Sequence, residues 1–279
     1  MLLQYTQRKK NMNKIYLAPS CQTWNEGKYA LFNTNEAKQA NLITGYIVKE
    51  LAKYRCEVHR GVITTGLGGN EKRANDLHCT SYYAIHTNAG PASAHGVTAL
   101  YQSWKGFSLS RRLKSHKMAS ELCKGIASMG RTNRGPVVGK KQSDGKEYFG
   151  DLRVPNMPSA ILEIEFHTNL DSTKWIMGNP AEIGKKIAKV IVSVEKLKLE
   201  PQAYPGAFPV FPVGVGFGSE ADVLRWQKFL CWAGYKTALD GEFGPDCKRQ
   251  TIAFQKAHGL EKDGMAGIKT VGIAKDVTR

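Results

Sequence analysis

The stretch AILEIEFHTN, residues 160–169, predicts a β-strand over 161–166 because its side chains alternate with a period of two. That period places Glu163, Glu165 and His167 on one face of the strand. Two carboxylates are costly to bury in a central strand unless they are paired or bind a metal. The pattern therefore indicates either a functional strand or an edge strand with one wet face.

Outward from this strand, short apolar segments alternate with segments of helical period. Strands that alternate with helices predict an α/β fold with a mostly parallel sheet and helices on both faces. Thr34 is a candidate cap for the first helix. The predicted strands are 14–19, 56–63, 82–86, 96–101 and 161–166, and the predicted helices are 35–54, 107–129 and 181–199.

A change in composition marks the end of this domain. Residues 201–218, PQAYPGAFPVFPVGVGFG, are rich in Pro and Gly and hold no charged side chain. They predict an extended linker whose aromatic residues pack on a neighbour. We therefore expect an N-terminal extension (1–12), an α/β catalytic domain (13–200), the linker (201–218) and a small all-α domain (219–279).

The last segment repeats a short motif. Asp240-Gly241 and Asp263-Gly264 each predict a tight turn before a helix, because Gly accepts a positive φ. The expected helices span about 220–234, 246–258 and 267–276, and apolar side chains at helical spacing supply their core.

The charge and cysteine pattern narrow the function classes. The chain carries a net charge of +16, of which residues 219–279 contribute +2. A basic protein is drawn to polyanions such as nucleic acid, anionic lipid or an anionic bacterial wall. The sequence has no dense Lys/Arg block and no C-x-x-C zinc module, which disfavours nucleic acid. No apolar run approaches the ~20 residues of a membrane span.

Two features bear on the compartment. Residues 1–11 lack an apolar core, so we expect no secretory signal. The six cysteines are scattered along the chain and are expected to be reduced thiols.

Two further residues lie at positions where α/β enzymes place their sites. His86 ends the predicted strand YYAIH, and Glu36 lies in the first turn of a predicted helix. Each alone has a structural interpretation: a buried core histidine, and an acid that stabilises the helix dipole. Their function depends on what they meet in the fold.

The C-terminal segment resembles the three-helix peptidoglycan-binding domain found on many wall hydrolases. The resemblance covers almost all of 219–279 and implies binding to the bacterial wall. The residues themselves are mostly turns and core, and show no ligand groove. The matching motifs are Asp222-Val223-Leu224, Trp226-Gln227, Leu230, Gly234-Tyr235, Asp240-Gly241-Glu242-Phe243-Gly244-Pro245, Phe254-Gln255, Gly259-Leu260 and Asp263-Gly264-Met265-Ala266-Gly267.

The N-terminal domain resembles the zinc-dependent N-acetylmuramoyl-L-alanine amidases of the type 3 family, including phage endolysins. The resemblance spans residues 14–197 and implies that Glu36 and His86 bind Zn²⁺ while Glu163 is the catalytic carboxylate. The matching pieces are Ile85-His86-Thr87-Asn88-Ala89, Asn35-Glu36, Arg73-Ala74-Asn75 and Glu163-x-x-Phe166-x-x-Asn169.

One position departs from that family. Its first zinc-binding His follows the first strand, where this chain has Pro19-Ser20-Cys21-Gln22. Direct register puts Cys21 there, whereas a subgroup with the form Pro-Ser-x-Gln favours Gln22. A thiolate binds Zn²⁺ well but, together with Glu36, cancels the charge of the metal; an amide oxygen leaves it at +1. We favour Gln22 over Cys21, with His167 as the next candidate.

The resemblance implies hydrolysis of the amide between N-acetylmuramic acid and the L-alanine of the stem peptide, with Glu163 as general acid and base. We expect a phage endolysin that stays in the host cytoplasm until its release to a Gram-positive wall. The alternatives are a bacterial autolysin, and a wall-binding protein that lost catalysis with the missing His. The expected partner is peptidoglycan, without nucleic acid or membrane insertion.

Overall fold

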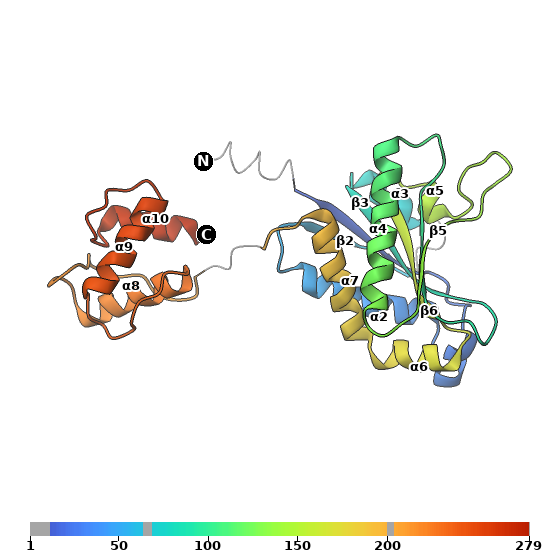
Figure 1. Cartoon of the computed structure of the whole chain (residues 1–279), viewed down its shortest axis with the longest axis horizontal. Helices are drawn as coiled ribbons and strands as arrows, with labels where there is room; N and C mark the ends of the chain where they lie inside the picture. Colours follow the sequence, from blue (N-terminus) through green and yellow to red (C-terminus); the bar gives the residue numbers. More distant parts are fainter. Residues whose placement is uncertain (1–11, 64–68, 200–203, 279) are drawn as a thin grey trace. The chain divides into compact units, whose positions relative to one another are not determined.

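The computed structural model describes residues 12–63, 69–199 and 204–278, and the chain divides into two compact units (Figure 1). The first unit is Met1–Glu200 and the second is Pro201–Arg279. The expected extension, residues 1–12, lies outside the described residues except for its last residue. No helix among the described ranges is long and apolar enough to cross a membrane.

A six-stranded mixed sheet forms the centre of the first unit, in the order β2-β1-β3-β6-β4-β5. All neighbouring strands are parallel except β4 and β6. The prediction of an α/β fold with a mostly parallel sheet is therefore confirmed. The strands are β1 (Lys14–Pro19), β2 (Glu57–Arg60), β3 (Ser81–Asn88), β4 (Val97–Tyr101), β5 (Asn133–Val138) and β6 (Ser159–Phe166).

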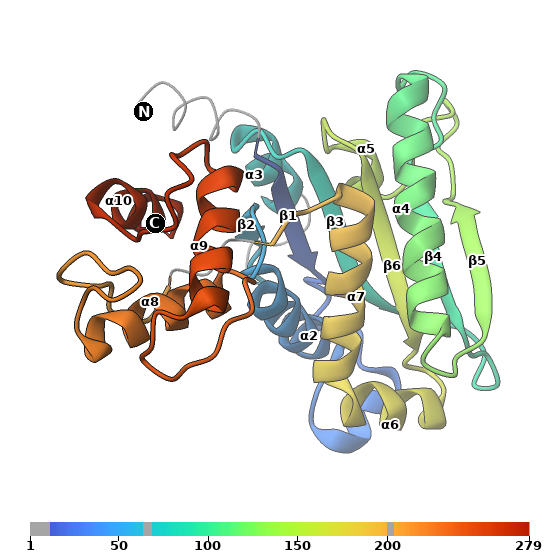
Figure 2. The same ribbon diagram turned by 60° about the vertical axis from the view of Figure 1, so that its left-hand side comes forward.

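Helices cover both faces of this sheet (Figure 2). Helices α2 (Glu36–Leu51), α4 (Leu109–Ala127) and α7 (Pro180–Glu195) bury the larger apolar core on one face. Helices α3 (Gly69–Asp76) and α5 (Gly150–Arg153) cover the other face, where Ala74 and Leu152 pack on strand side chains. The remaining elements of this unit are the 3-10 helix η1 (Gly27–Phe32) and α6 (Leu170–Gly178).

Helix α2 shows how the sequence pattern produces the packing. Its apolar positions recur every three or four residues, and Ala37, Ile43 and Leu51 among them are fully buried. The cap is Asn35 and not Thr34, because the Asn35 side chain accepts a hydrogen bond from the Lys38 backbone N–H. This cap places Glu36 at the first helical position, where its side chain contacts His86 near the C-terminal end of β3.

The second unit is a three-helix domain, as predicted, built from α8 (Glu220–Trp232), α9 (Pro245–Ala257) and α10 (Ile268–Val277). Its core is centred on Trp226, Phe229 and Phe254. Two linker aromatics, Tyr204 and Phe208, pack against this core as expected. The other two, Phe211 and Phe217, are 67% and 54% exposed, so the expectation that they pack on a neighbour is wrong within this unit.

Paired glutamines explain the repeated Asp-Gly motif. The Gln227 side chain accepts from the Gly241 N–H and donates to Asp240 Oδ1 and the Glu242 carbonyl. Gln255 makes the same contacts with Asp263-Gly264-Met265 and also reaches Thr270. Gly241 and Gly264 have φ of 75° and 74°, in the left-handed region that favours glycine. Each buried glutamine therefore fixes one turn between helices.

Candidate active site

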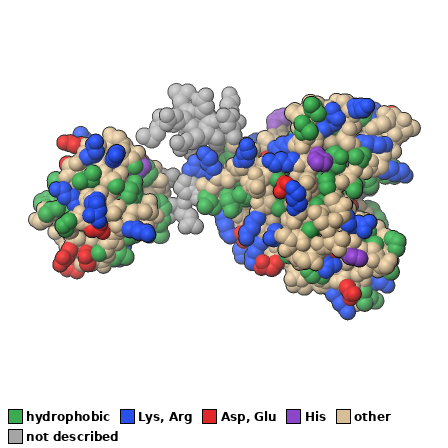
Figure 3. Space-filling model, viewed as in Figure 1, with side chains coloured by type: hydrophobic (Ala, Val, Ile, Leu, Met, Phe, Trp, Pro, Cys, Tyr) green, Lys and Arg blue, Asp and Glu red, His purple; other side chains and the backbone are tan. Residues whose placement is uncertain are grey.

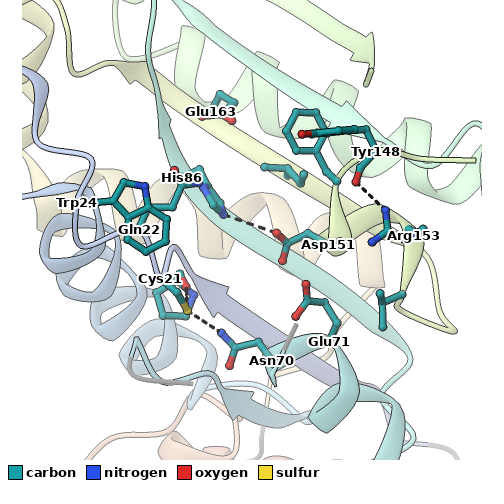
Figure 4. Close-up of a pocket in the computed structure, with 15 residues that line it drawn as sticks. Cys21, Gln22, Trp24, Asn70, Glu71, His86, Tyr148, Asp151, Arg153 and Glu163 are labelled. Atoms are coloured by element: carbon teal, nitrogen blue, oxygen red, sulfur yellow. Dashed lines mark hydrogen bonds and ion pairs between the residues drawn. The ribbon is translucent and has the colours of Figure 1, made fainter. Parts of the chain in front are cut away.

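A pocket of about 490 Å³ opens on the sheet face that α3 and α5 cover. His86 comes from β3, Glu163 from β6, and Gln22 from the loop after β1, so three neighbouring strands supply the polar wall (Figure 4). The structure thus brings His86, Glu163 and Gln22 together in one pocket. Its full lining is Pro19, Cys21, Gln22, Trp24, Asn70, Glu71, His86, Tyr148, Phe149, Gly150, Asp151, Arg153, Val154, Ile161 and Glu163.

Glu36 and His86 meet at the edge of this pocket. His86 Nδ1 lies 2.9 Å from Glu36 Oε1, and the Glu36 side chain is 1% exposed. Burial lowers the pKa of His86, but the hydrogen bond and negative charge of Glu36 outweigh it and raise that pKa to about 9. Burial has the opposite effect on Glu36 and raises the pKa of this carboxyl. The contacts with His86 and Ser20 outweigh burial and bring the pKa of Glu36 below its ordinary value. The two groups form a strongly coupled pair.

Glu163 lies directly across from His86, since the two residues are register partners on β3 and β6. Its Oε2 is buried without a hydrogen-bond partner among the described residues. Burial raises the pKa of Glu163 to about 7; the charge of His86 lowers it, and the charges of Glu36 and Asp151 raise it. A carboxylate with such a pKa is suited to accept and return a proton near neutral pH.

The two candidates for the missing histidine point to different surroundings (Figure 4). The Cys21 thiol contacts the Val62 carbonyl at 3.6 Å and the Asn70 side-chain amide at 3.5 Å. Gln22 Oε1 instead accepts from Asn25 Nδ2 at 3.4 Å, and the same nitrogen donates to Glu36 Oε2 at 2.6 Å. Asn25 thus links the Gln22 amide to Glu36.

His167 supports this arrangement from behind the pocket. It is fully buried, with Nε2 at 3.0 Å from Asn25 Oδ1 and Nδ1 at 2.9 Å from Thr87 Oγ1. Burial lowers the pKa of His167, which favours the neutral ring. A neutral ring that donates to Asn25 Oδ1 leaves the Asn25 amino group facing Glu36 and Gln22.

The expectation that Glu165 shares a face with Glu163 is wrong. Between the pairs His86–Glu163 and Asn88–Phe166, β6 contains one residue more than β3, which is a β-bulge. Glu165 is fully buried and binds Arg131, the Gly96 N–H and the Ser172 hydroxyl. Its role is structural, and it does not contact Glu163 through either oxygen.

Sequence reasoning missed Glu71 and Asp151, which line the pocket from α3 and α5. Asp151 Oδ2 lies 3.9 Å from His86 Nε2, and its Oδ1 accepts from the Tyr82 hydroxyl at 2.6 Å. Each acid lies in a short polar helix with no periodic signal, and only the packing of α3 and α5 on one sheet face brings the two together.

The side chains around His86 bear on the zinc ion that the family resemblance implies. No group of three His, Cys, Asp or Glu side chains able to hold a metal occurs in the described ranges, so neither Cys21 nor His167 completes a set with Glu36 and His86. The spacing of Glu36 and His86 is nevertheless close to the ~3.3 Å that separates two tetrahedral zinc ligands at about 2.0 Å. Glu36 and His86 therefore provide two donor groups at a spacing compatible with a shared zinc ion, and Gln22 lines the same pocket.

Comparisons with known proteins identify a family for each unit. Residues 15–193 match the N-acetylmuramoyl-L-alanine amidase family (Amidase_3), and residues 219–273 match a peptidoglycan binding domain family (PG_binding_1). No curated protein sequence matches the chain.

Solved structures share the fold of the first unit. The catalytic domain of CwlV, an N-acetylmuramoyl-L-alanine amidase from Bacillus (Paenibacillus) polymyxa var. colistinus, is 18% identical with a TM-score of 0.54, over 67% of this chain and 100% of that one. An N-acetylmuramoyl-L-alanine amidase from Clostridium difficile 630 is 21% identical with a TM-score of 0.53, over 67% and 96%.

Cwp6 from Clostridium difficile is 20% identical with a TM-score of 0.54, over 66% of this chain, which spans only 30% of the length of Cwp6. At these identities the structures establish the fold of the first unit, and the match over 15–193 establishes the family. The chain belongs to the N-acetylmuramoyl-L-alanine amidase family and carries a peptidoglycan-binding domain at its C-terminal end.

Proposed function

We propose that the protein is a zinc-dependent peptidoglycan hydrolase that cleaves the amide between N-acetylmuramic acid and the L-alanine of the stem peptide. The observation that carries this proposal is the placement of Glu163 opposite His86, with Glu36 in contact with His86. A base with an unpartnered oxygen, facing two metal-binding side chains in one pocket, is the arrangement that metal-assisted amide hydrolysis needs.

Gln22, Glu36 and His86 would hold the metal. A bound zinc ion supplies Lewis acidity toward the scissile carbonyl and makes water more acidic. Asn25 supports Gln22 as the third ligand, because it holds the Gln22 amide on the side of Glu36. The Cys21 thiol contacts Asn70 and Val62 instead.

Glu163 moves the proton. Its Oε2 is free to accept a proton from the attacking water and then to deliver it to the nitrogen of the leaving L-alanine. The buried setting of Glu163 raises its basicity, and His86 beside it limits the charge repulsion from Glu36 and Asp151.

The test is digestion of purified cell walls. New N-terminal alanine without new reducing ends is the expected result. Reducing ends alone would assign the protein to the glycosidases. Binding to walls with no cleavage by the zinc-loaded protein would favour the catalytically impaired wall binder.

The two units divide the work in this proposal. Residues 13–200 hydrolyse soluble muropeptides, residues 201–218 are the linker, and residues 219–279 bind insoluble wall. A fragment of residues 1–200 should cleave soluble muropeptides, and a fragment of residues 201–279 should sediment with wall. Failure of the second fragment to sediment would remove its role as a targeting module.

The charge supports an anionic wall as the target. Figure 3 shows Lys and Arg side chains scattered over the visible face of each unit, without one dense block. The net charge of +16 favours accumulation on the polyanionic walls of Gram-positive bacteria.

We propose a phage endolysin role, which a host cell can test. Production in the cytoplasm should lyse the cell only when a membrane pore is also formed. Lysis without the pore would favour a bacterial autolysin that is exported.

A further inference from the structure

Two further carboxylates line the pocket. They are separate from the three residues proposed to hold zinc and from Glu163, the proposed base. Glu71 projects from α3 and Asp151 from α5; the Asp151 carboxylate lies beside His86, and the Glu71 carboxylate lies next to Asp151 (Figure 4). Neither is needed for the proposed cleavage. In a chain with a net charge of +16, a pocket wall with two extra acids calls for a separate explanation.

Glu71 is buried, and its charge is unpaired within the described residues. The residue is 5% exposed, and no other described residue donates a hydrogen bond or forms an ion pair with its carboxylate. Its close approach to α5 requires Gly150, because a Cβ at that position would lie 2.8 Å from Glu71 Oε1. The fold therefore holds against the pocket a buried carboxylate whose hydrogen-bond partner among the described residues is its own backbone N–H.

Asp151 retains one oxygen for a ligand. The Tyr82 hydroxyl donates to Oδ1 at 2.6 Å, which fixes the carboxylate, while Oδ2 faces the pocket at 3.9 Å from His86 Nε2. Arg153 is engaged elsewhere, because it donates to the carbonyls of Glu147 and Tyr148 and forms no ion pair with either acid among the described residues. The cation nearest to Asp151 is His86, which Glu36 already contacts at 2.9 Å.

The electrostatics of Glu71 favour a cation beside it. Burial, and then the charge of Asp151, raise the pKa of Glu71 to about 7. Its own backbone N–H and the charges of His86 and Arg153 lower that pKa without offsetting the rise, so the negative charge of Glu71 is only partly compensated by the protein. A cation between the two carboxylates would remove that cost and form charge-assisted hydrogen bonds.

We propose that Glu71 and Asp151 form a subsite that binds a primary ammonium group of the muropeptide substrate. This inference rests on the proposed function, because it places the ammonium near the scissile amide. Two sources share that chemistry: the side-chain amine of a diamino acid in the stem peptide, and the 2-amine of a de-N-acetylated sugar. An ammonium suits the pair better than a divalent metal, because no third ligand joins them in the described ranges.

The test measures binding and not turnover. Calorimetric titration of the Glu163→Gln protein with soluble muropeptides compares each amine in its free and its acetylated form. Acetylation of the recognised amine should weaken binding about 10- to 100-fold, the usual effect of losing a charge-assisted hydrogen bond. The stem-peptide amine and the sugar amine are acetylated separately. The acetylation that weakens binding identifies the recognised amine.

Variants then assign the effect to the pair. In Glu71→Gln, and independently in Asp151→Asn, the dissociation constants for the free and the acetylated muropeptide should differ by no more than about twofold. The matched control is Glu121→Gln on α4, which removes the same charge from an exposed residue paired with Lys124 and should keep the ratio.

Three outcomes would overturn the subsite: no effect of acetylating either amine, the same ratio in both variants, or Ca²⁺ binding that Glu71→Gln abolishes. A failure of the proposed function looks different. In that case the protein with Glu163 intact releases no N-terminal alanine, while the discrimination between free and acetylated amines persists.

Discussion

Gln255→Met tests whether buried glutamines hold the second unit together. The Gln255 side chain contacts Asp263 Oδ1 at 2.7 Å, the Met265 carbonyl at 2.9 Å, Thr270 Oγ1 at 3.1 Å and the Gly264 N–H at 3.0 Å. Methionine has a similar length and shape, so the change removes these polar contacts while it largely preserves the packing.

The magnitude follows from the contacts. The amide has two hydrogens for three acceptors, so about three hydrogen bonds are lost at roughly 1 kcal/mol each, and the buried Gly264 N–H loses its partner. The free energy of unfolding should fall by about 3–4 kcal/mol. For a unit of this size, that change lowers Tm by roughly 15 °C or more.

Differential scanning calorimetry of the full chain measures this effect. One transition should move down by that amount, and the transition of the amidase unit should stay in place. Lys256→Met, at the next and exposed position of α9, is the matched control and should shift neither transition appreciably. A Gln255→Met shift no larger than that of the control would refute the idea that this side chain fixes the turn.

Three other outcomes are expected. Glu163→Gln should lower kcat by about 100-fold or more with zinc content unchanged, because the proton carrier is lost and the ligands remain; near-normal turnover would move the role to another group. Gln22→Ala should lose zinc and activity while Cys21→Ser keeps both, and zinc analysis of the two purified variants decides between the ligands. Glu71→Gln should be more stable than the wild type at pH 8 but not at pH 4.5. The pKa of Glu71 is about 7 in the folded state and 4.5 ordinarily, so between these pH values the folded wild type binds more protons than the unfolded chain. The wild type therefore loses stability as pH rises through this range. Urea unfolding at both pH values checks this, and an equal difference at the two pH values would contradict it.

The sequence predicted the elements whose signal is local. Helix α2 and strands β1, β3 and β6 follow from apolar spacing. His86, at the end of a predicted strand, and Glu163, within another, became site candidates through the family resemblance. Strand β5 was missed because Asn133–Val138 contains Gly and Pro and lies at the sheet edge, where such residues are tolerated.

The rest of the site depends on tertiary contacts. The orientation of Glu165 could not be predicted, because it depends on the β-bulge. The bulge arises from pairing with β3 and is not visible in the alternating sequence of β6. Asn25 lies in a loop, and its link from Gln22 to Glu36 depends on how that loop folds over the sheet. Glu71 and Asp151 are 80 residues apart along the chain and meet only through α3 and α5.

The bulge in β6 has a consequence for protein engineering. Glu163 precedes the bulge and faces the pocket, whereas Glu165 lies within the bulge and ties the strand to Arg131 and Ser172. Since the two carboxylates share no partner, their substitutions should combine additively, in contrast to neighbours within one network. A single strand thereby carries two separable positions: substitution of Glu163 should change turnover, and substitution of Glu165 should lower stability, because Arg131 and the Gly96 N–H would lose their partner.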